Sequence, residues 1–351
     1  MLAGLVVFMS VGAGDRDRPV FSGYGSFSVG VTTLSLPGGP VTEVWYPVDG
    51  NSVVGLSTEV FDHLSVFPVD IKSQIPPELF PAIDTGAYRD ASPSVEGPFP
   101  LVIFSHGFGG YRQISSFYTT HLASWGFVVA ASDHEERGLL AVIEGIARSS
   151  ADDDRGDVQS LLAAIIDGTV TKEISSTVDR NRVAIVGYSA GATTAVAAAD
   201  LEEVDTFIAL SGRGEPTEVA RTKPALIFAE EDDRVVPAFI SEQLYERMTG
   251  KALFVVIANG GHAALVDLCP AWTGASDLLV RLTPWLGSVT ALSNGCGPGY
   301  PEAQDVWSVL RHVSVGHLYE VFGVTDVGLA LSETATDSVS RAELSAFETK
   351  P

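Results

Sequence analysis

The sequence has few basic residues, few cysteines and no hydrophobic run long enough to cross a membrane. Lysine and arginine number 21 against 44 acidic residues, which gives a formal net charge of −23 at pH 7. Nucleic acid and anionic bilayers repel so acidic a chain, so we expect neither as a partner and no stable membrane insertion. The two cysteines, Cys269 and Cys296, lack the C-x-x-C spacing of zinc sites. We expect them to form a disulfide, with two buried thiols as the alternative.

The length and composition indicate one large domain. With 351 residues, of which 46% are hydrophobic, the chain is long enough for one core of the size common in α/β enzymes. We expect this domain at residues 20–330 and a frayed acidic tail at 331–351. Residues 1–19 resemble a signal peptide, because 2–11 is apolar and 12–14 is Gly-Ala-Gly, although a basic n-region is missing. We therefore expect a secreted or periplasmic protein, with a disordered N-terminus and a cytoplasmic protein as the alternative.

The stretch Gly187-Tyr188-Ser189-Ala190-Gly191 is the most informative part of the chain. It follows an apolar run at 183–186 and precedes a helical pattern of small residues at 192–200. Strand, sharp turn and helix are the context of a nucleophile elbow, in which glycines on both sides of the serine permit the turn. The pattern predicts that Ser189 is a nucleophile at the carboxyl end of a parallel sheet.

An acid and a base for this serine follow in the expected order along the chain. Two further apolar runs are predicted strands: 224–229 and 253–257. The first is followed by Asp233, with Asp232 as the alternative acid, and the second by His262. Because open α/β sheets place their sites at the carboxyl ends of strands, these side chains are expected to meet. We expect His262 to take the proton of Ser189, and Asp233 to orient His262.

A glycine-rich loop, Ser105-His106-Gly107-Phe108-Gly109-Gly110, follows another predicted strand at 100–104. In hydrolases with a serine elbow, the second oxyanion donor comes from such a loop. We assign the oxyanion hole to the backbone N–H groups of Phe108 and Ala190. A phosphate-binding loop is excluded, because the chain has no G-x-x-x-x-G-K-[ST] motif.

Other polar residues are expected to be structural or solvated. Glu230 and Glu231 belong to an acidic cluster that we expect to be a solvated loop. His134 follows a predicted strand and is expected to tie down a loop together with Asp133. The remaining histidines without a strand-end context are expected to be structural or exposed: His63, His121, His312 and His317.

Three stretches carry a resemblance to a known family: Val44–Pro47, Gly97–Gly110 and Leu122–Ala130. With the elbow, the Asp233 loop and the Gly261-His262 turn, they make residues 21–291 resemble serine esterases of the α/β-hydrolase superfamily. The group contains platelet-activating-factor acetylhydrolases, dienelactone-hydrolase-like bacterial esterases and cutinase-type polyester hydrolases. The resemblance implies an α/β-hydrolase fold, with a mainly parallel central sheet flanked by helices. The alternation of predicted strands and helices independently favours such a sheet.

Three features of the sequence restrict the activities that this resemblance implies. Dienelactone hydrolases use a cysteine nucleophile, whereas this chain has Ser189. Polyester hydrolases and acetylhydrolases of the group usually carry a tryptophan after the strand that follows the nucleophile helix. Here that position falls in residues 210–215, which contain no aromatic side chain. A cap domain is usually inserted at 211–223, and this connection is too short for a large one. We expect an open site.

The combined prediction is a carboxylic ester hydrolase that works through an acyl-enzyme and requires neither metal nor cofactor. Its partner is a small-molecule or polymer ester, and short-chain or exposed esters are expected to fit the open site. Polyester or phospholipid acetyl-ester hydrolysis by the same residues is one alternative. A non-catalytic binding protein on the same fold is an alternative of another class.

Overall fold

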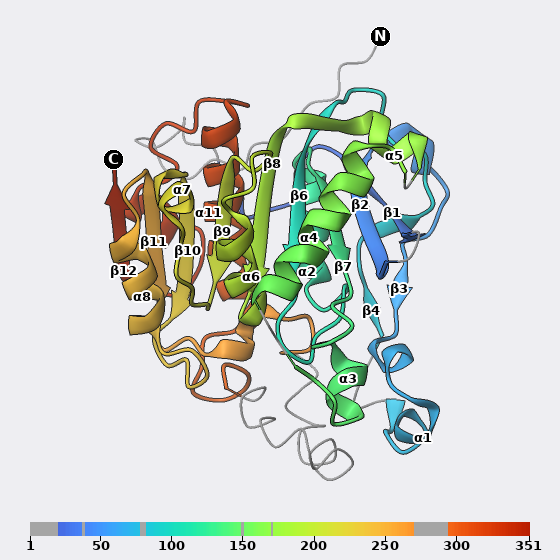
Figure 1. The fold of residues 1–351 in the computed structure, drawn as a ribbon, viewed down its shortest axis with the longest axis horizontal. Coiled ribbons are helices and arrows are strands. Elements are labelled where there is room, and N and C mark those ends of the chain that lie inside the picture. The colour runs from blue at the N-terminus through green and yellow to red at the C-terminus, as the bar shows by residue number, and fades with distance from the viewer. Residues whose placement is uncertain (1–19, 37–38, 78–81, 149–150, 170, 270–293) are drawn as a thin grey trace.

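The computed structural model describes residues 20–36, 39–77, 82–148, 151–169, 171–269 and 294–351, so the predicted signal peptide lies outside the described residues. Their main strands are β1 (Ser28–Ser35), β2 (Val41–Val48), β5 (Ala87–Arg89), β6 (Phe99–Ser105), β7 (Val128–Ser132), β8 (Val178–Tyr188), β9 (Thr206–Leu210), β10 (Ala225–Glu230), β11 (Ala252–Ile257) and β12 (Leu344–Lys350). These ten strands form one sheet in the order β12-β11-β10-β9-β8-β6-β7-β2-β1-β5 (Figure 1). Two short strands, β3 (Val60–Phe61) and β4 (Ile83–Asp84), pair separately.

The centre of the sheet is parallel. Strands β7, β6, β8, β9, β10 and β11 are neighbours in that order, and every pair among them runs in the same direction. Every residue of β6, β7, β9, β10 and β11 is buried. Continuous apolar runs are required here because both faces of a parallel sheet are covered. The prediction of a mainly parallel sheet is confirmed, with β2 and β12 as antiparallel additions.

Helices cover both faces of the sheet (Figure 1). The longer helices are α2 (Ser116–Ser124), α4 (Ala151–Ile166), α6 (Ala190–Ala198), α8 (Ala238–Arg247) and α11 (Ala303–Phe322). The shorter ones are α1 (Val69–Lys72), α3 (Leu139–Ile143), α5 (Lys172–Thr177), α7 (Glu218–Thr222) and α12 (Glu333–Asp337), with 3₁₀ turns η1 (Gly50–Val53), η2 (His63–Val66) and η4 (His262–Leu265).

Alternate residues of β6 show how the two faces are divided. Val102 and Phe104 pack in the core formed with α2 and α11. Leu101 and Ile103 pack in the core formed with α4. This alternation follows from the two-residue period of a strand. The helices that cover the two faces are therefore held by opposite sides of the same strands.

The connection in which a cap would be inserted, between β9 and β10, is short. The connection from β9 to β10 spans residues 211–224 and carries only the five-residue α7. The expectation of no large cap at this position is therefore confirmed. No helix of the described residues is long and apolar enough to cross a bilayer.

The C-terminal segment corrects the expected frayed tail at 331–351. Its residues Leu344–Lys350 form β12, which pairs antiparallel with β11. The Lys350 ammonium donates to three carbonyl oxygens at the end of α8, those of Tyr245, Glu246 and Met248, at 2.6, 3.0 and 3.1 Å. The polar composition concealed a strand because an edge strand buries little of its surface. The domain therefore continues past the predicted boundary at residue 330.

All seven histidines are buried, including the four expected to be structural or exposed. His317 shows the consequence most clearly: it is a buried residue of α11, and its Nε2 is 2.7 Å from Thr206 Oγ1. Burial, together with the nearby charge of Lys251, lowers the pKa of His317 to about 3 from an ordinary value of 6.5. The folded protein thus keeps this ring neutral at a pH where the unfolded chain protonates it.

We predict that His317→Gln weakens the pH dependence of stability. The stabilising effect of a neutral His317 is fully present above pH 6.5 and is lost as the pH falls toward 3. The free energy of unfolding of the wild type should therefore fall, relative to that of the variant, by roughly 1.4 kcal/mol per pH unit in this window. Urea unfolding between pH 8 and pH 4.5 measures the difference. Parallel curves for the two proteins would contradict the assignment.

Candidate active site

Ser189 lies at the turn between β8 and α6, in a strained backbone conformation. Its φ is 57° and its ψ is −118°, a combination rare for a residue with a side chain. A Cβ added to Gly187 would lie 1.8 Å from Gly191 O, and one added to Gly191 would lie 2.0 Å from Ser105 O. Both flanking glycines are therefore required by contact with neighbouring backbone. The turn that the motif predicts is present.

The structure brings the three predicted catalytic side chains together. The Oγ of Ser189 is 2.9 Å from Nε2 of His262, and Nδ1 of His262 is 2.6 Å from Oδ2 of Asp233. Asp233 and His262 are only 4% and 5% exposed, whereas Ser189 is half-buried. The alternative acid, Asp232, is exposed. The geometry therefore selects Asp233 as the hydrogen-bond partner of the histidine.

The carboxylate of Asp233 is itself held in place. Its Oδ1 accepts hydrogen bonds from the N–H groups of Val235 and Val236, at 2.7 and 2.8 Å. These bonds fix the carboxylate, so its other oxygen stays directed at His262. On the far side, the carbonyl oxygen of His262 accepts a hydrogen bond from the Tyr188 hydroxyl at 2.8 Å.

The two predicted oxyanion donors have free N–H groups. Among the described residues, neither the N–H of Phe108 nor that of Ala190 has a hydrogen-bond partner. The neighbouring N–H of Gly109, in contrast, donates to Arg137 O at 2.8 Å. The loop packs closely on the elbow, because a Cβ added to Gly107 would lie 3.2 Å from the Cβ of Ser189. Ala190 opens α6, so its N–H is one that a helix leaves unpaired.

Asn294 joins the loop that carries Asp233 to the loop that carries His262, and the sequence analysis did not identify it. Its Oδ1 accepts from the N–H of Arg234 at 2.8 Å and from that of His262 at 3.2 Å. Its Nδ2 donates to Asp232 O at 3.0 Å. Asn294 is 2% exposed, and no local pattern marks it, since its partners beside Asp233 and at His262 lie 32 to 62 residues away.

The expected disulfide is confirmed. Cys269 and Cys296 are bonded, with Cα atoms 5.3 Å apart and a sequence separation of 27. Cys296 stands two residues after Asn294, so the bond anchors the segment that carries Asn294 against the chain that follows His262. A cross-link here therefore supports the loop geometry of the site.

Glu230 corrects the expectation of a solvated acidic loop, whereas Glu231 is exposed as expected. Glu230 is the last residue of β10 and has no exposed surface. The hydroxyl of Ser211 donates a hydrogen bond to its carboxyl group. Burial and the nearby charge of Asp233 raise the pKa of Glu230 well above its usual range. The strand continues one residue further than the apolar run, which is why the composition misled.

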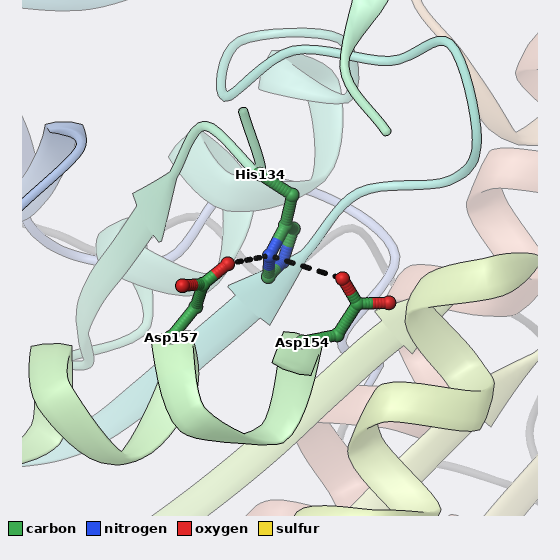
Figure 2. A group of neighbouring side chains, drawn as sticks. All are labelled: His134, Asp154 and Asp157. Atoms are coloured by element: carbon green, nitrogen blue, oxygen red, sulfur yellow. Dashed lines mark hydrogen bonds and ion pairs between the residues drawn. The ribbon is translucent and has the colours of Figure 1, made fainter. Parts of the chain in front are cut away.

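A second polar cluster surrounds His134 at the base of the glycine-rich loop (Figure 2). His134, Asp154 and Asp157 each offer one ligand atom, and these atoms lie within 4.8 Å of one another. This is the spacing of a possible metal site. The buried guanidinium of Arg137 already bonds Asp154, however, so the chain itself supplies a positive charge to the cluster.

Comparisons of the sequence identify similar proteins. The family described as "Platelet-activating factor acetylhydrolase, isoform II" matches residues 43–162, a range that holds the glycine-rich loop and ends before Ser189. The chain is 34% identical over 123 residues to a platelet-activating factor acetylhydrolase of Bos taurus, covering 32% of this chain and 28% of that one. It is 29% identical over 148 residues to the protein of that name from Canis lupus familiaris, covering 40% and 33%. The chain thus matches about a third of the length of these relatives or less.

Two further proteins extend the comparison. Lipase 1 of Moraxella sp. (strain TA144) is 25% identical over 178 residues, which is 50% of each chain. The structure of a ferulic acid esterase from Streptomyces cinnamoneus matches with a TM-score of 0.59 and 19% identity, over 84% of this chain and 90% of that one. This structural likeness shows that the chain has the α/β-hydrolase fold, as the sequence resemblance implied.

We predict that Gly191→Ala disrupts the elbow. The added methyl group would overlap the Ser105 carbonyl, so the free energy of unfolding should fall by about 3 kcal/mol or more. Gly156→Ala in α4 is the matched control, because nothing lies within 4 Å of its added Cβ. That control should gain up to about 1 kcal/mol from helix propensity. Chemical denaturation measures both, and equal stabilities of the two variants would refute the close approach.

Proposed function

We propose that this protein is a serine carboxylic ester hydrolase. The observation that carries the proposal is the continuous hydrogen-bonded chain from Asp233 through His262 to Ser189, ending at a half-buried hydroxyl on a strained turn. A serine hydroxyl needs an adjacent base, and the base needs a group that fixes its tautomer. With Asp233 on Nδ1, the Nε2 of His262 is left to accept the serine proton. The similarity to acetylhydrolases, a lipase and an esterase supports the same chemistry.

In the proposed mechanism, Ser189 Oγ attacks the ester carbonyl as His262 takes its proton. The negative oxygen that forms is stabilised by the N–H groups of Phe108 and Ala190, which are free to donate. Each such donor contributes about 3 kcal/mol to the stability of a transition state. His262 then protonates the leaving alcohol, and a water molecule activated by the same histidine releases the acid. No step draws on a metal or a cofactor.

The proposed substrates are short-chain or exposed esters. The small α7 connection supports this choice, because it is too short to hold a cap domain between β9 and β10. Phospholipid acetyl esters are the second candidate, and the family match over residues 43–162 favours them. Polyester hydrolysis is a weaker alternative, because Ser211 to Glu215 offers no aromatic side chain beside the elbow.

We further infer that the protein is exported. The Cys269–Cys296 disulfide supports this, because such bonds persist in oxidising compartments. N-terminal sequencing of protein recovered from culture medium or periplasm should then return a chain that lacks Met1. Recovery of the protein only from the cytosol, with Met1 in place, would contradict export and leave the proposed chemistry untouched.

Ester hydrolysis is tested with p-nitrophenyl esters from acetate to palmitate. The wild type should turn over the short esters fastest, and Ser189→Ala should lose at least about 10³-fold in kcat with an unchanged circular dichroism spectrum. Release of acetate from a phospholipid acetyl ester, measured with the same pair, tests the second candidate. Equal rates for the two proteins would refute the role of Ser189. No turnover by the wild type on any ester would favour a binding protein.

A further inference from the structure

A second Ser–His–Asp chain lies beneath the glycine-rich loop. Ser105 Oγ is 2.8 Å from Nε2 of His134. Nδ1 of His134 is 2.8 Å from Oδ2 of Asp157, and Figure 2 shows this second contact. Ser105 has no exposed surface, and His134 is 3% exposed. No ester can reach this serine, so the second chain has a role other than nucleophilic attack.

Arg137 is the centre of this cluster. Its side chain is fully buried, which is rare for arginine unless its donors are paired. Nη2 donates to Ser105 Oγ at 2.8 Å and to the carbonyl oxygen of His106 at 2.7 Å. Nη1 donates to Thr194 Oγ1 at 2.8 Å and to the carboxylate of Asp154. One planar guanidinium therefore joins β6, the loop that follows it, α4 and α6.

The hydrogen-bond pattern fixes the proton positions in the cluster. The backbone N–H of His134 donates to the ring Nε2 of His106 at 3.0 Å. The ring proton of His106 is therefore on Nδ1, which donates to Gly107 O at 2.8 Å. Burial and the charge of Arg137 hold the pKa values of both His134 and His106 well below their usual range. Both rings are therefore neutral, and their hydrogen bonds hold the start of the loop in place.

The backbone around Arg137 also forms hydrogen bonds with the glycine-rich loop. Arg137 O accepts from the N–H of Gly109 at 2.8 Å, and Gly110 O accepts from the N–H of Leu139 at 3.0 Å. With the bond from Arg137 to His106 O, the loop is held on both sides of Phe108. The N–H of Phe108 is the first proposed oxyanion donor, so its position depends on these bonds.

The second proposed donor is tied to the same guanidinium through Thr194. The Thr194 hydroxyl accepts from Arg137 and donates to the carbonyl oxygen of Ala190 at 3.3 Å. Thr194 is fully buried on α6, one turn after Ala190. Arg137 is therefore linked to a carbonyl group on each side of the proposed oxyanion hole, directly to that of His106 and through the Thr194 hydroxyl to that of Ala190.

The same atoms are less suited to a metal ion. A cation between Asp154 and Asp157 would meet the guanidinium of Arg137, which is already bonded to Asp154. To bind a metal ion through Nδ1, His134 would have to lose its hydrogen bond to Asp157. Its other ring nitrogen, Nε2, is already hydrogen-bonded to Ser105. The permanent charge of arginine balances Asp154 without an ion, and its Nη1 and Nη2 atoms also donate to Ser105, His106 O and Thr194.

We propose that Arg137 is a positioning residue that sets the spacing between the Phe108 and Ala190 N–H groups. The inference rests on the proposed function, since it concerns the oxyanion hole of that reaction. Its physical basis is that electrostatic stabilisation depends on donors being held in place before charge develops. A small displacement of either donor should lower kcat while binding of the uncharged ester, and so KM, stays nearly constant.

The first test is a pair of variants at Thr194. Thr194→Val has the same shape but breaks the link from Arg137 to Ala190 O, and should lower kcat about tenfold with KM within about twofold. Thr194→Ser keeps the hydroxyl and should restore most of kcat. Rates are expressed per active site, titrated with a phosphonate ester, so that misfolded protein does not count. Binding of a trifluoromethyl ketone, which forms a tetrahedral adduct, should weaken in proportion to kcat.

The second test replaces Arg137 itself. Arg137→Lys keeps the charge beside Asp154 but cannot reach His106 O and Thr194 together, so kcat should fall about 100-fold. Arg155→Lys is the matched control, because Arg155 bonds Asp200 and Ala197 O and does not contact the loop. Its kcat should equal that of the wild type.

The outcomes separate the two proposals. An inactive wild type would overturn the proposed function. An active wild type in which Arg137→Lys and Thr194→Val both keep kcat within about twofold per titrated site would overturn the positioning role alone. A Thr194→Val loss that Thr194→Ser also shows would likewise assign the effect to packing. If Arg137→Lys does not fold, the Thr194 pair decides.

Discussion

The structure depends on one steric constraint, the close approach of backbone segments where β8 turns into α6. Gly187 meets the backbone of Gly191, and Gly191 meets that of Ser105 at the end of β6, with no room for a side chain at either glycine. This packing, with the bond from Ser189 N to Leu210 O at 2.8 Å, over-determines the strained backbone of Ser189. Strain of this kind persists only where the surroundings enforce it. The parallel sheet thereby presents the hydroxyl to His262.

Two Ser–His–Asp chains occur in one molecule, and their surroundings distinguish them. Both have hydrogen bonds of similar length, from Ser189 through His262 in one and from Ser105 through His134 in the other. Ser189 is half-buried, whereas Ser105 is fully buried and also bonded to Arg137. Residue types and distances alone therefore do not define a nucleophile. Access for the substrate decides which serine is proposed as the nucleophile, and the buried set is proposed to act as a structural support.

Local patterns in the sequence were sufficient for the parallel strands, the elbow and the meeting of Ser189 with His262. They were sufficient because a strand end and the residue after it are neighbours in the chain. Asn294, Arg137 and β12 escaped prediction because their partners are distant: Arg137 contacts Thr194 57 residues away, and β12 pairs with β11 across the whole C-terminal segment. Glu230 was assigned to solvent by its charge, since composition does not reveal where a buried strand stops. Contacts between residues far apart in the sequence determine the positions of Asn294, Arg137 and β12 and the burial of Glu230.

The most direct measurement of the central claim is the site of covalent modification by diethyl p-nitrophenyl phosphate. Serine hydrolases react with it at the activated hydroxyl, which loses its proton to the base as the phosphorus–oxygen bond forms and p-nitrophenolate leaves. After digestion, mass spectrometry of the native protein should find one diethylphosphoryl group, on the peptide that contains Ser189. Modification of Ser105 in its place, or ester hydrolysis that continues with Ser189 unmodified, would contradict the account.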